Sequence, residues 1–201
     1  GLGAALVGLA GAILSIFYYI HPHAAHSSIF QVPSGLAGQG LLSWSGVRPS
    51  AGYRVVLLTA GTDAPADAVT GAIEDWADAE HVDLRTVDAA GHHVDGIVEA
   101  INLRPDLIVS AGNALVDALA LVTASHLDQQ FLVVGAELAE PTGNVTAVDW
   151  TGASFRGEGL GMSSTWDPAS FTPARCAAAI RAGVAAVLTH LTGIVLWLDH
   201  F

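Results

Sequence analysis

Residues that could bind a small ligand occur in the segments that follow short apolar runs in this sequence. They are Asp63, Asp67, Gly112, Asn113 and Glu137. Carboxylate and amide groups can hydrogen-bond a polar solute, and ligands of parallel α/β sheets bind where the strands end. Loops after such strands also contain Gly, Asn and Asp simply to form turns and helix caps. A small-ligand site and a set of ordinary caps are therefore both open interpretations.

Motifs for nucleotide binding or covalent catalysis are missing. The sequence has no G-x-G-x-x-G after its first apolar run, no G-x-S-x-G, and no lysine for a phosphate-binding loop. Cys176 is the only cysteine, which excludes an intramolecular disulfide and a cysteine zinc cluster. His21, His23 and His26 have no acidic or cysteine ligand close by. We therefore predict no catalytic residue, no metal and no cofactor.

Composition narrows the class of protein further. The chain has 201 residues, of which 52% are apolar, and a formal net charge of −12. It offers ample apolar surface for a folded domain. A strongly acidic chain is a poor partner for polyanions, so nucleic-acid binding is not expected.

Alternating strand-like and helix-like segments follow residue 52. Apolar strand patterns cover 54–59, 82–87, 107–110, 131–134, 145–148 and 194–198, and helix patterns cover 67–79, 94–103, 115–125 and 173–191. Solid apolar runs separated by amphipathic helices are typical of strands buried on both faces of a parallel sheet. We predict one α/β domain over residues 53–201, a three-layer sandwich with a mostly parallel sheet.

Residues 1–20 are predicted to form a transmembrane helix. The run from Leu2 to Ile20 has no charged residue and no proline, and as a helix it would be roughly 28 Å long, enough to cross a bilayer. A retained signal peptide and a buried core helix are the alternatives. We expect a single-pass protein of the cell membrane with its α/β domain on the extracytoplasmic side.

Small residues are concentrated on one side of this helix, at Ala4, Gly8, Gly11, Ala12 and Ser15. Such spacing allows close approach of a second helix within the bilayer. We therefore expect the helix to pack against an integral membrane protein subunit.

The segment 21–52 is predicted to be a linker rich in Pro, Gly and Ser. Its apolar residues are Ile29, Phe30, Leu41, Leu42 and Trp44. A free tether would be more polar. We expect these residues to contact a partner; packing against their own domain is the alternative.

Several motifs of the α/β region, in their order, resemble a known family. They are Pro105–Gly112, Asp117–Ala120, Phe131–Gly135, Gly143–Val148 and Gly152–Gly157. In this order they are similar to the first lobe of the basic membrane protein family, the nucleoside-binding lipoproteins of ABC importers. The resemblance covers residues 53 to 160, about half of the chain. It implies a periplasmic-binding-protein-like lobe.

Departures from the family weaken the functional part of the resemblance. The family places an aromatic residue and an asparagine after its first strand, whereas Asp63–Val69 contains neither. No lipobox cysteine is present, and the sequence ends at Phe201, where a second lobe would begin. A binding protein of this family closes two lobes around its ligand.

Three functions remain after these exclusions, and an enzyme that uses the carboxylates at the strand ends is the least favoured of them. The first is a non-catalytic, membrane-anchored accessory or assembly subunit of a larger bacterial envelope complex, with the α/β domain as a docking scaffold. The alternative is a solute-binding protein of the ABC-importer type, for a nucleoside-like or other small ligand. A lysine-free, alanine-rich chain points to a GC-rich, actinobacterial source, where a respiratory supercomplex is the first host to consider.

Overall fold

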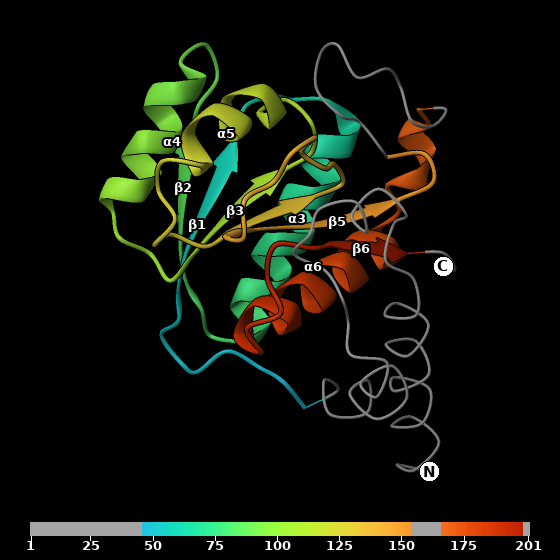
Figure 1. Ribbon diagram of the computed structural model, residues 1–201. Coiled ribbons are helices and arrows are strands. Elements are labelled where there is room, and N and C mark those ends of the chain that lie inside the picture. The colour runs from blue at the N-terminus through green and yellow to red at the C-terminus, as the bar shows by residue number, and fades with distance from the viewer. Residues whose placement is uncertain (1–45, 154–165, 199–201) are drawn as a thin grey trace, which may run out of the picture.

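The structure, a computed structural model, describes residues 46–153 and 166–198 (Figure 1). The described strands are β1 (Arg54–Thr59), β2 (Asp83–Asp88), β3 (Leu107–Ala111), β4 (Phe131–Val134), β5 (Val145–Trp150) and β6 (Val195–Leu198). The helices are α3 (Ala64–Ala79), α4 (His93–Asn102), α5 (Val116–Thr123), the 3₁₀ turn η2 (Pro168–Ser170) and α6 (Pro173–Leu188).

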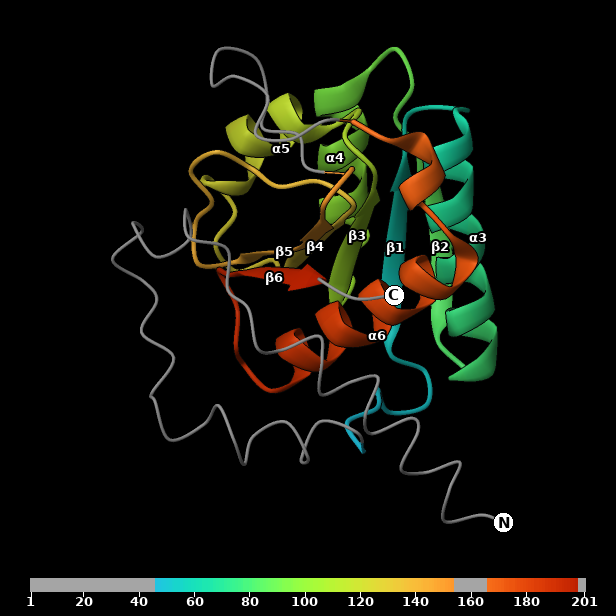
Figure 2. The same cartoon turned by 90° about the vertical axis from the view of Figure 1, so that its right-hand side faces the viewer.

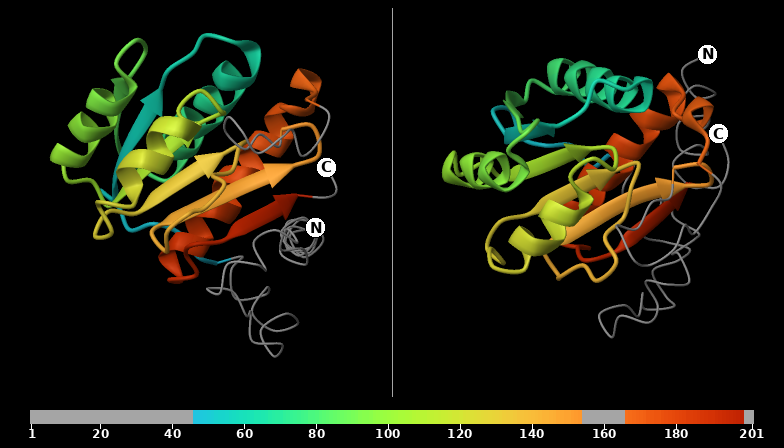
Figure 3. Two further views of the ribbon diagram at one scale, coloured as in Figure 1. Left: turned by 45° about the horizontal axis from the view of Figure 1, so that its top comes forward. Right: turned by 90° about the horizontal axis from the view of Figure 1, so that it is seen from above.

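A single parallel sheet forms the middle layer of the domain. Its strand order is β2-β1-β3-β4-β5-β6, and every neighbouring pair is parallel. Figure 3 shows the last strand, β6, at the edge of the sheet beyond β5. The predicted parallel α/β architecture is confirmed.

Alternate residues of each strand face two separate apolar layers. On one face the strands pack against α3 and α6, with Leu57 and Leu132 among the fully buried side chains. On the other face they pack against α4 and α5, with Leu58 and Phe131 buried there. The two pairs of helices lie on opposite sides of the sheet (Figure 2). The three layers follow from the solid apolar runs of the sequence, because a strand in such a sheet must be apolar on both faces.

The crossover through α6 has the opposite hand to the crossovers through α3, α4 and α5. From β1 the chain moves through α3, on one face of the sheet, toward the β2 edge. Through α4 and α5, on the opposite face, it moves toward the β6 edge. It continues in that direction from β5 to β6, but α6 lies on the face of α3. A βαβ unit of this hand is rare. Here it lets α6 cover β4 and β5 on the face that α3 covers only in part.

Most predicted segments agree with the structure to within two residues. The strand 54–59 is reproduced without change, and Thr172 caps α6 as its Oγ1 accepts a hydrogen bond from the Arg175 amide at 3.2 Å. α3 begins at Ala64, three residues before its predicted start, because Asp63 is the cap and Pro65 fits the first turn. The helix predicted to reach residue 191 ends at Leu188.

Residues 46–52, predicted as part of the linker, contact the end of α3. The Arg48 guanidinium lies 3.3 Å from the Glu80 carboxylate, and the Gly52 amide donates to the His81 carbonyl at 3.1 Å. The predicted membrane helix with its packing residues, and the predicted partner contacts between residues 29 and 44, lie outside the described residues. Within 46–153 and 166–198, no helix is both long and apolar enough to cross a bilayer.

Candidate functional site

The carboxyl ends of β1 and β3 form the switch point of the sheet. The two strands are neighbours, with Leu58 opposite Ser110. After β1 the chain turns to α3 on one face, and after β3 it turns to α5 on the other face. The two loops therefore diverge, and such a divergence creates the crevice in which open α/β sheets bind ligands. Figure 1 shows the two loops at the same end of the sheet.

Neither glycine at the edge of this crevice is crowded where a side chain would stand. A Cβ placed on Gly112 would meet no atom within 4 Å, and one on Gly61 would meet only the Asp63 Oδ2 at 4.0 Å. Gly112 also has a φ of +72°, which favours glycine. Its amide is fixed by a 2.9 Å hydrogen bond to the Val134 carbonyl. Gly61 is exposed, whereas Gly112 is itself buried, although no atom stands where its side chain would be.

Asp63 and Asp67 make the α3 side of the crevice acidic. The Asp63 Oδ1 accepts a hydrogen bond from the Ala66 amide at 2.7 Å and caps the helix. Asp67 is exposed in the first turn. The positive end of the α3 dipole therefore already interacts with the carboxylates of Asp63 and Asp67. This side of the crevice favours hydrogen-bond donors and cations over phosphate.

The α5 side of the crevice offers hydrogen-bonding groups of a different kind. Asn113 is half-buried, and its carbonyl accepts from the Val116 amide at 3.3 Å. The N-terminus of α5 has no side-chain cap. The first turn of a helix contains amides without internal partners. The amide side chain of Asn113 and these backbone groups complete the two walls of the crevice.

Glu137 does not join the other predicted residues. It follows β4 rather than β1 or β3, and it is only 2% exposed. The end of β4 is covered, because a Cβ on Gly135 would lie 2.6 Å from the Phe171 ring. Four of the predicted residues, Asp63, Asp67, Gly112 and Asn113, thus surround the switch point, whereas Glu137 is buried beside it.

An aromatic cluster at the ends of β4 and β5 was not predicted from the sequence. Trp150 and Phe171 meet edge to face with ring centroids 5.0 Å apart, and Trp166 lies 5.4 Å from Phe171. The Trp150 Nε1 donates to the Ser170 Oγ at 3.0 Å. This cluster covers the carboxyl end of β4, where the Phe171 ring crowds Gly135. No local pattern connects Trp150 with residues twenty positions later, so the sequence contained no usable signal.

Metal coordination finds no support in this part of the chain. In residues 46–153 and 166–198, no group of three or more His, Cys, Asp or Glu side chains could hold a metal ion. Asp63, Asp67 and Asn113 offer carboxylate and amide groups for hydrogen bonding and charge attraction at the crevice.

Comparisons with known proteins add little to this geometry. No protein-family model matches the chain, and no curated protein matches it. One similar solved structure is an ABC transporter solute-binding protein from Aeropyrum pernix K1, with 19% identity, a TM-score of 0.42, and coverage of 52% of this chain and 29% of that one. Another is an ABC transporter solute-binding protein from Conexibacter woesei, with 15% identity, a TM-score of 0.37, and coverage of 48% and 35%.

The chain thus matches about a third of the length of these structures. A likeness at this identity extends to the fold alone, and at these TM-scores it says nothing of what the chain binds. Neither structure is described as nucleoside-binding, so the resemblance to the nucleoside-binding family stays a prediction.

Proposed function

We propose that the α/β domain is a non-catalytic binding lobe that holds a small polar solute, neutral or positively charged, at the β1/β3 crevice. The unfilled space beside Gly61 and Gly112 carries this proposal, because a Cβ on Gly112 would meet no atom within 4 Å and one on Gly61 would meet only the Asp63 Oδ2 at 4.0 Å. A ligand can contact main-chain groups there directly. This function corresponds to the solute-binding alternative of the sequence analysis.

The charges around the crevice support the choice of ligand. Asp63 and Asp67 lie on one wall and Asp117 lies in the first turn of α5 on the other. A phosphate or carboxylate ligand would be repelled by all three, whereas an amine would be attracted. Single exposed charges contribute about 0.2–1 kcal/mol each, so affinity must come mainly from hydrogen bonds and shape.

Calorimetry on the full-length chain tests the proposal with four probes: spermidine, glucose, and the anionic counterparts glucose 6-phosphate and citrate. We expect saturable binding of spermidine or glucose, and neither anion should displace it from the crevice. Asp63→Asn keeps the helix cap, since Asn is as good a cap as Asp, and should weaken spermidine binding about twofold to fivefold.

Asp83→Asn provides the matched control, because it removes the same charge from an exposed position on β2, at the other end of the sheet. It should leave spermidine binding unchanged. The proposal fails if neither spermidine nor glucose binds, or if the two variants behave alike.

A second candidate, the accessory docking subunit, is favoured by a separate observation on α3. Three described glycines lie inside helices. A Cβ on Gly96 would lie 2.5 Å from Ala89, and one on Gly183 would lie 2.5 Å from Leu132, whereas one on Gly71 would meet nothing within 4 Å. Glycine inside a helix is destabilising relative to alanine. Nothing within the described fold requires it at position 71.

Gly71 lies in a surface groove of about 480 Å³ between α3 and α6. The floor of the groove consists of small side chains, together with Trp76, and its rim is mainly acidic: Asp67, Asp75 and Glu80, with Arg181. Small residues allow close approach of a helix, and the acidic rim matches a helix with arginine or lysine along its flanks. A second copy of this chain is disfavoured, because two acidic rims would face each other.

Native electrophoresis of the full-length chain, extracted from its own membranes in mild detergent, tests this candidate. We expect the wild-type chain to migrate in an assembly larger than the monomer and Gly71→Leu to migrate as the monomer. Ala120→Leu, at an exposed position on α5, is the control and should remain assembled. Monomeric migration of the wild-type chain, or an assembled Gly71→Leu variant, would exclude the docking role.

A further inference from the structure

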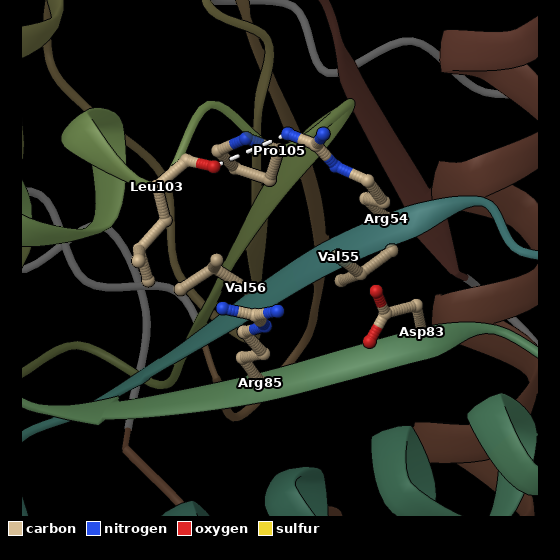
Figure 4. Close-up of a pocket in the computed structure, with 7 residues that line it drawn as sticks. All are labelled: Arg54, Val55, Val56, Asp83, Arg85, Leu103 and Pro105. Atoms are coloured by element: carbon tan, nitrogen blue, oxygen red, sulfur yellow. Dashed lines mark hydrogen bonds between the residues drawn. The ribbon is translucent and has the colours of Figure 1, made fainter.

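A cavity of about 240 Å³ lies at the amino end of the sheet, opposite the crevice. It is lined by Arg54, Val55, Val56, Asp83, Arg85, Leu103 and Pro105. Figure 4 shows the Arg54 guanidinium beside Leu103 and Pro105 on one side of Val56, and the Arg85 side chain on the other side. Two guanidinium groups at one cavity are notable in a chain with 7 bases and 19 acids.

Arg54 is held in place by the start of β3. Its amide donates to the Asp106 Oδ2 at 2.8 Å, and its carbonyl accepts from the Asp106 amide at 2.8 Å. Its guanidinium donates to the Leu103 carbonyl at 3.1 Å. A guanidinium has five N–H donors, so the remaining donors of Arg54 are available to a ligand.

The Leu103 carbonyl lies next to a turn with a strained backbone. Arg104, the residue before Pro105, has a φ of +51° and donates its amide to the Ile101 carbonyl at 2.9 Å. A left-handed conformation is unfavourable for a residue with a side chain. The surrounding structure must hold this turn in its strained conformation, and the Leu103 carbonyl that accepts from Arg54 precedes it directly.

Arg85 lies across the cavity on β2 without a described partner. It is exposed and stands opposite Val56 in the sheet. Among residues 46–153 and 166–198, no hydrogen bond or ion pair involves its guanidinium, and Arg48–Glu80 is the only described ion pair of these residues. Asp83 lines the same cavity, yet neither arginine forms an ion pair with it there. Two guanidinium groups and one carboxylate therefore line the cavity, which leaves it with a net positive charge.

We propose that this cavity binds a small oxyanion, a carboxylate or a phosphate group, between the guanidinium groups of Arg54 and Arg85. Guanidinium groups match the geometry of both anions and form the stronger class of hydrogen bond with them. The apolar side chains of Leu103 and Pro105 contact the uncharged part of an organic ligand. This site is separate from the crevice and does not depend on the function proposed above.

Titration calorimetry of the full-length chain at constant ionic strength tests the proposal, with butyrate and inorganic phosphate as probes. We expect at least one of them to bind saturably. Arg85→Gln should weaken that binding about tenfold, as the loss of a charged hydrogen-bonding partner predicts. Asp83→Asn should strengthen it, because a neighbouring negative charge is removed.

Two further variants make the test specific. Leu103→Ala should weaken butyrate binding and leave phosphate binding unchanged, which separates an organic acid from free phosphate. Arg181→Gln removes the same charge as Arg85→Gln on α6, on the other face of the sheet, and should have no effect. Absence of saturable binding with both probes, or equal binding by Arg85→Gln and the wild-type chain, would overturn the proposal.

Discussion

The two helical layers hold the sheet by different means. In the layer of α3 and α6, both helices are 16 residues long, and α6 buries a nearly continuous run of small side chains from Ala178 to Val187. In the layer of α4 and α5, the helices have 10 and 8 residues. There a buried asparagine, Asn144, fixes the loop after α5 through donors to three carbonyls, those of Thr123, His126 and Gln129.

This difference shows which kind of change each layer tolerates. Close packing of α6 against Leu132 and Val148 leaves no room for added volume. The short helices of the other layer depend on a polar group whose partners are buried and cannot turn to water. Volume should therefore decide the stability of one layer, and hydrogen bonding that of the other.

The largest effect is expected from added volume at Gly183. A Cβ there would lie 2.5 and 2.8 Å from the two methyl groups of Leu132 and 3.0 Å from Val148. Gly183→Val should lower the free energy of unfolding by about 3 kcal/mol, at the upper end of the range for overpacked cores. Urea denaturation of the full-length chain measures this loss. A loss no larger than that of Gly71→Val would contradict the volume argument.

Loss of the buried amide at Asn144 should have the next largest effect. Asn144→Ala removes the donor to three carbonyls, which lie 2.9–3.1 Å away, and should cost about 2–3 kcal/mol in urea denaturation. Asn144→Asp has the same shape but cannot donate, so it should be at least as damaging. If Asn144→Asp were as stable as the wild-type chain, hydrogen bonding would not hold this layer.

The pH dependence of stability distinguishes the layers further. Burial raises the pKa of the Cys176 thiol in α6 from 9.0 to about 11, although Arg175 acts in the opposite direction. The unfolded thiol thus ionises first, and stability is lost as the pH rises from 9.0 to about 11. We expect this loss to be about 1–2 kcal/mol.

Cys176→Ala isolates this contribution. Burial also raises the pKa of Tyr53, with a smaller effect of Asp106, to about 12, so both chains should lose stability above pH 10. The difference between their unfolding free energies should change between pH 9 and 11 only through the thiol. A constant difference over this range would show that Cys176 is not buried as described.

The smallest effect is expected at Gly71, and its sign is reversed. Because a Cβ there meets nothing, Gly71→Ala should raise the free energy of unfolding by about 0.5–1 kcal/mol, as alanine is the better helix former. Thermal unfolding of the full-length chain measures this gain. A loss of stability would mean that the groove between α3 and α6 is already filled.

Much of the fold could be predicted because each element has a local pattern. The runs Arg54–Thr59 and Phe131–Val134 are apolar and short, and the structure makes them strands with those bounds. The helix predicted to begin at residue 173 does so, with Thr172 as its cap. The start of α3 was placed late because its first turn, Ala64–Ala66, has little apolar periodicity, although Asp63 is a good cap.

The candidate site could be predicted only in part. Asp63 follows β1 and Gly112 follows β3. Because these strands are parallel neighbours, their loops lie at the same edge of the sheet. The covering of β4 by Phe171 was not predictable, since it depends on a contact between segments far apart in the chain. The cavity at the amino end was missed for the same reason: Arg54 and Arg85 lie in separate strands, and no motif joins them.

The position of α6 affects how the domain forms during translation. α3 leaves the ribosome about a hundred residues before α6, which corresponds to about 5–20 s of synthesis. Leu132 and Val148, on the sheet face that α6 will cover, are made in the later part of that interval and have no helix to shield them until α6 follows. The nascent chain therefore passes through a stage with exposed apolar strands, and the emergence of Pro173–Leu188 ends it.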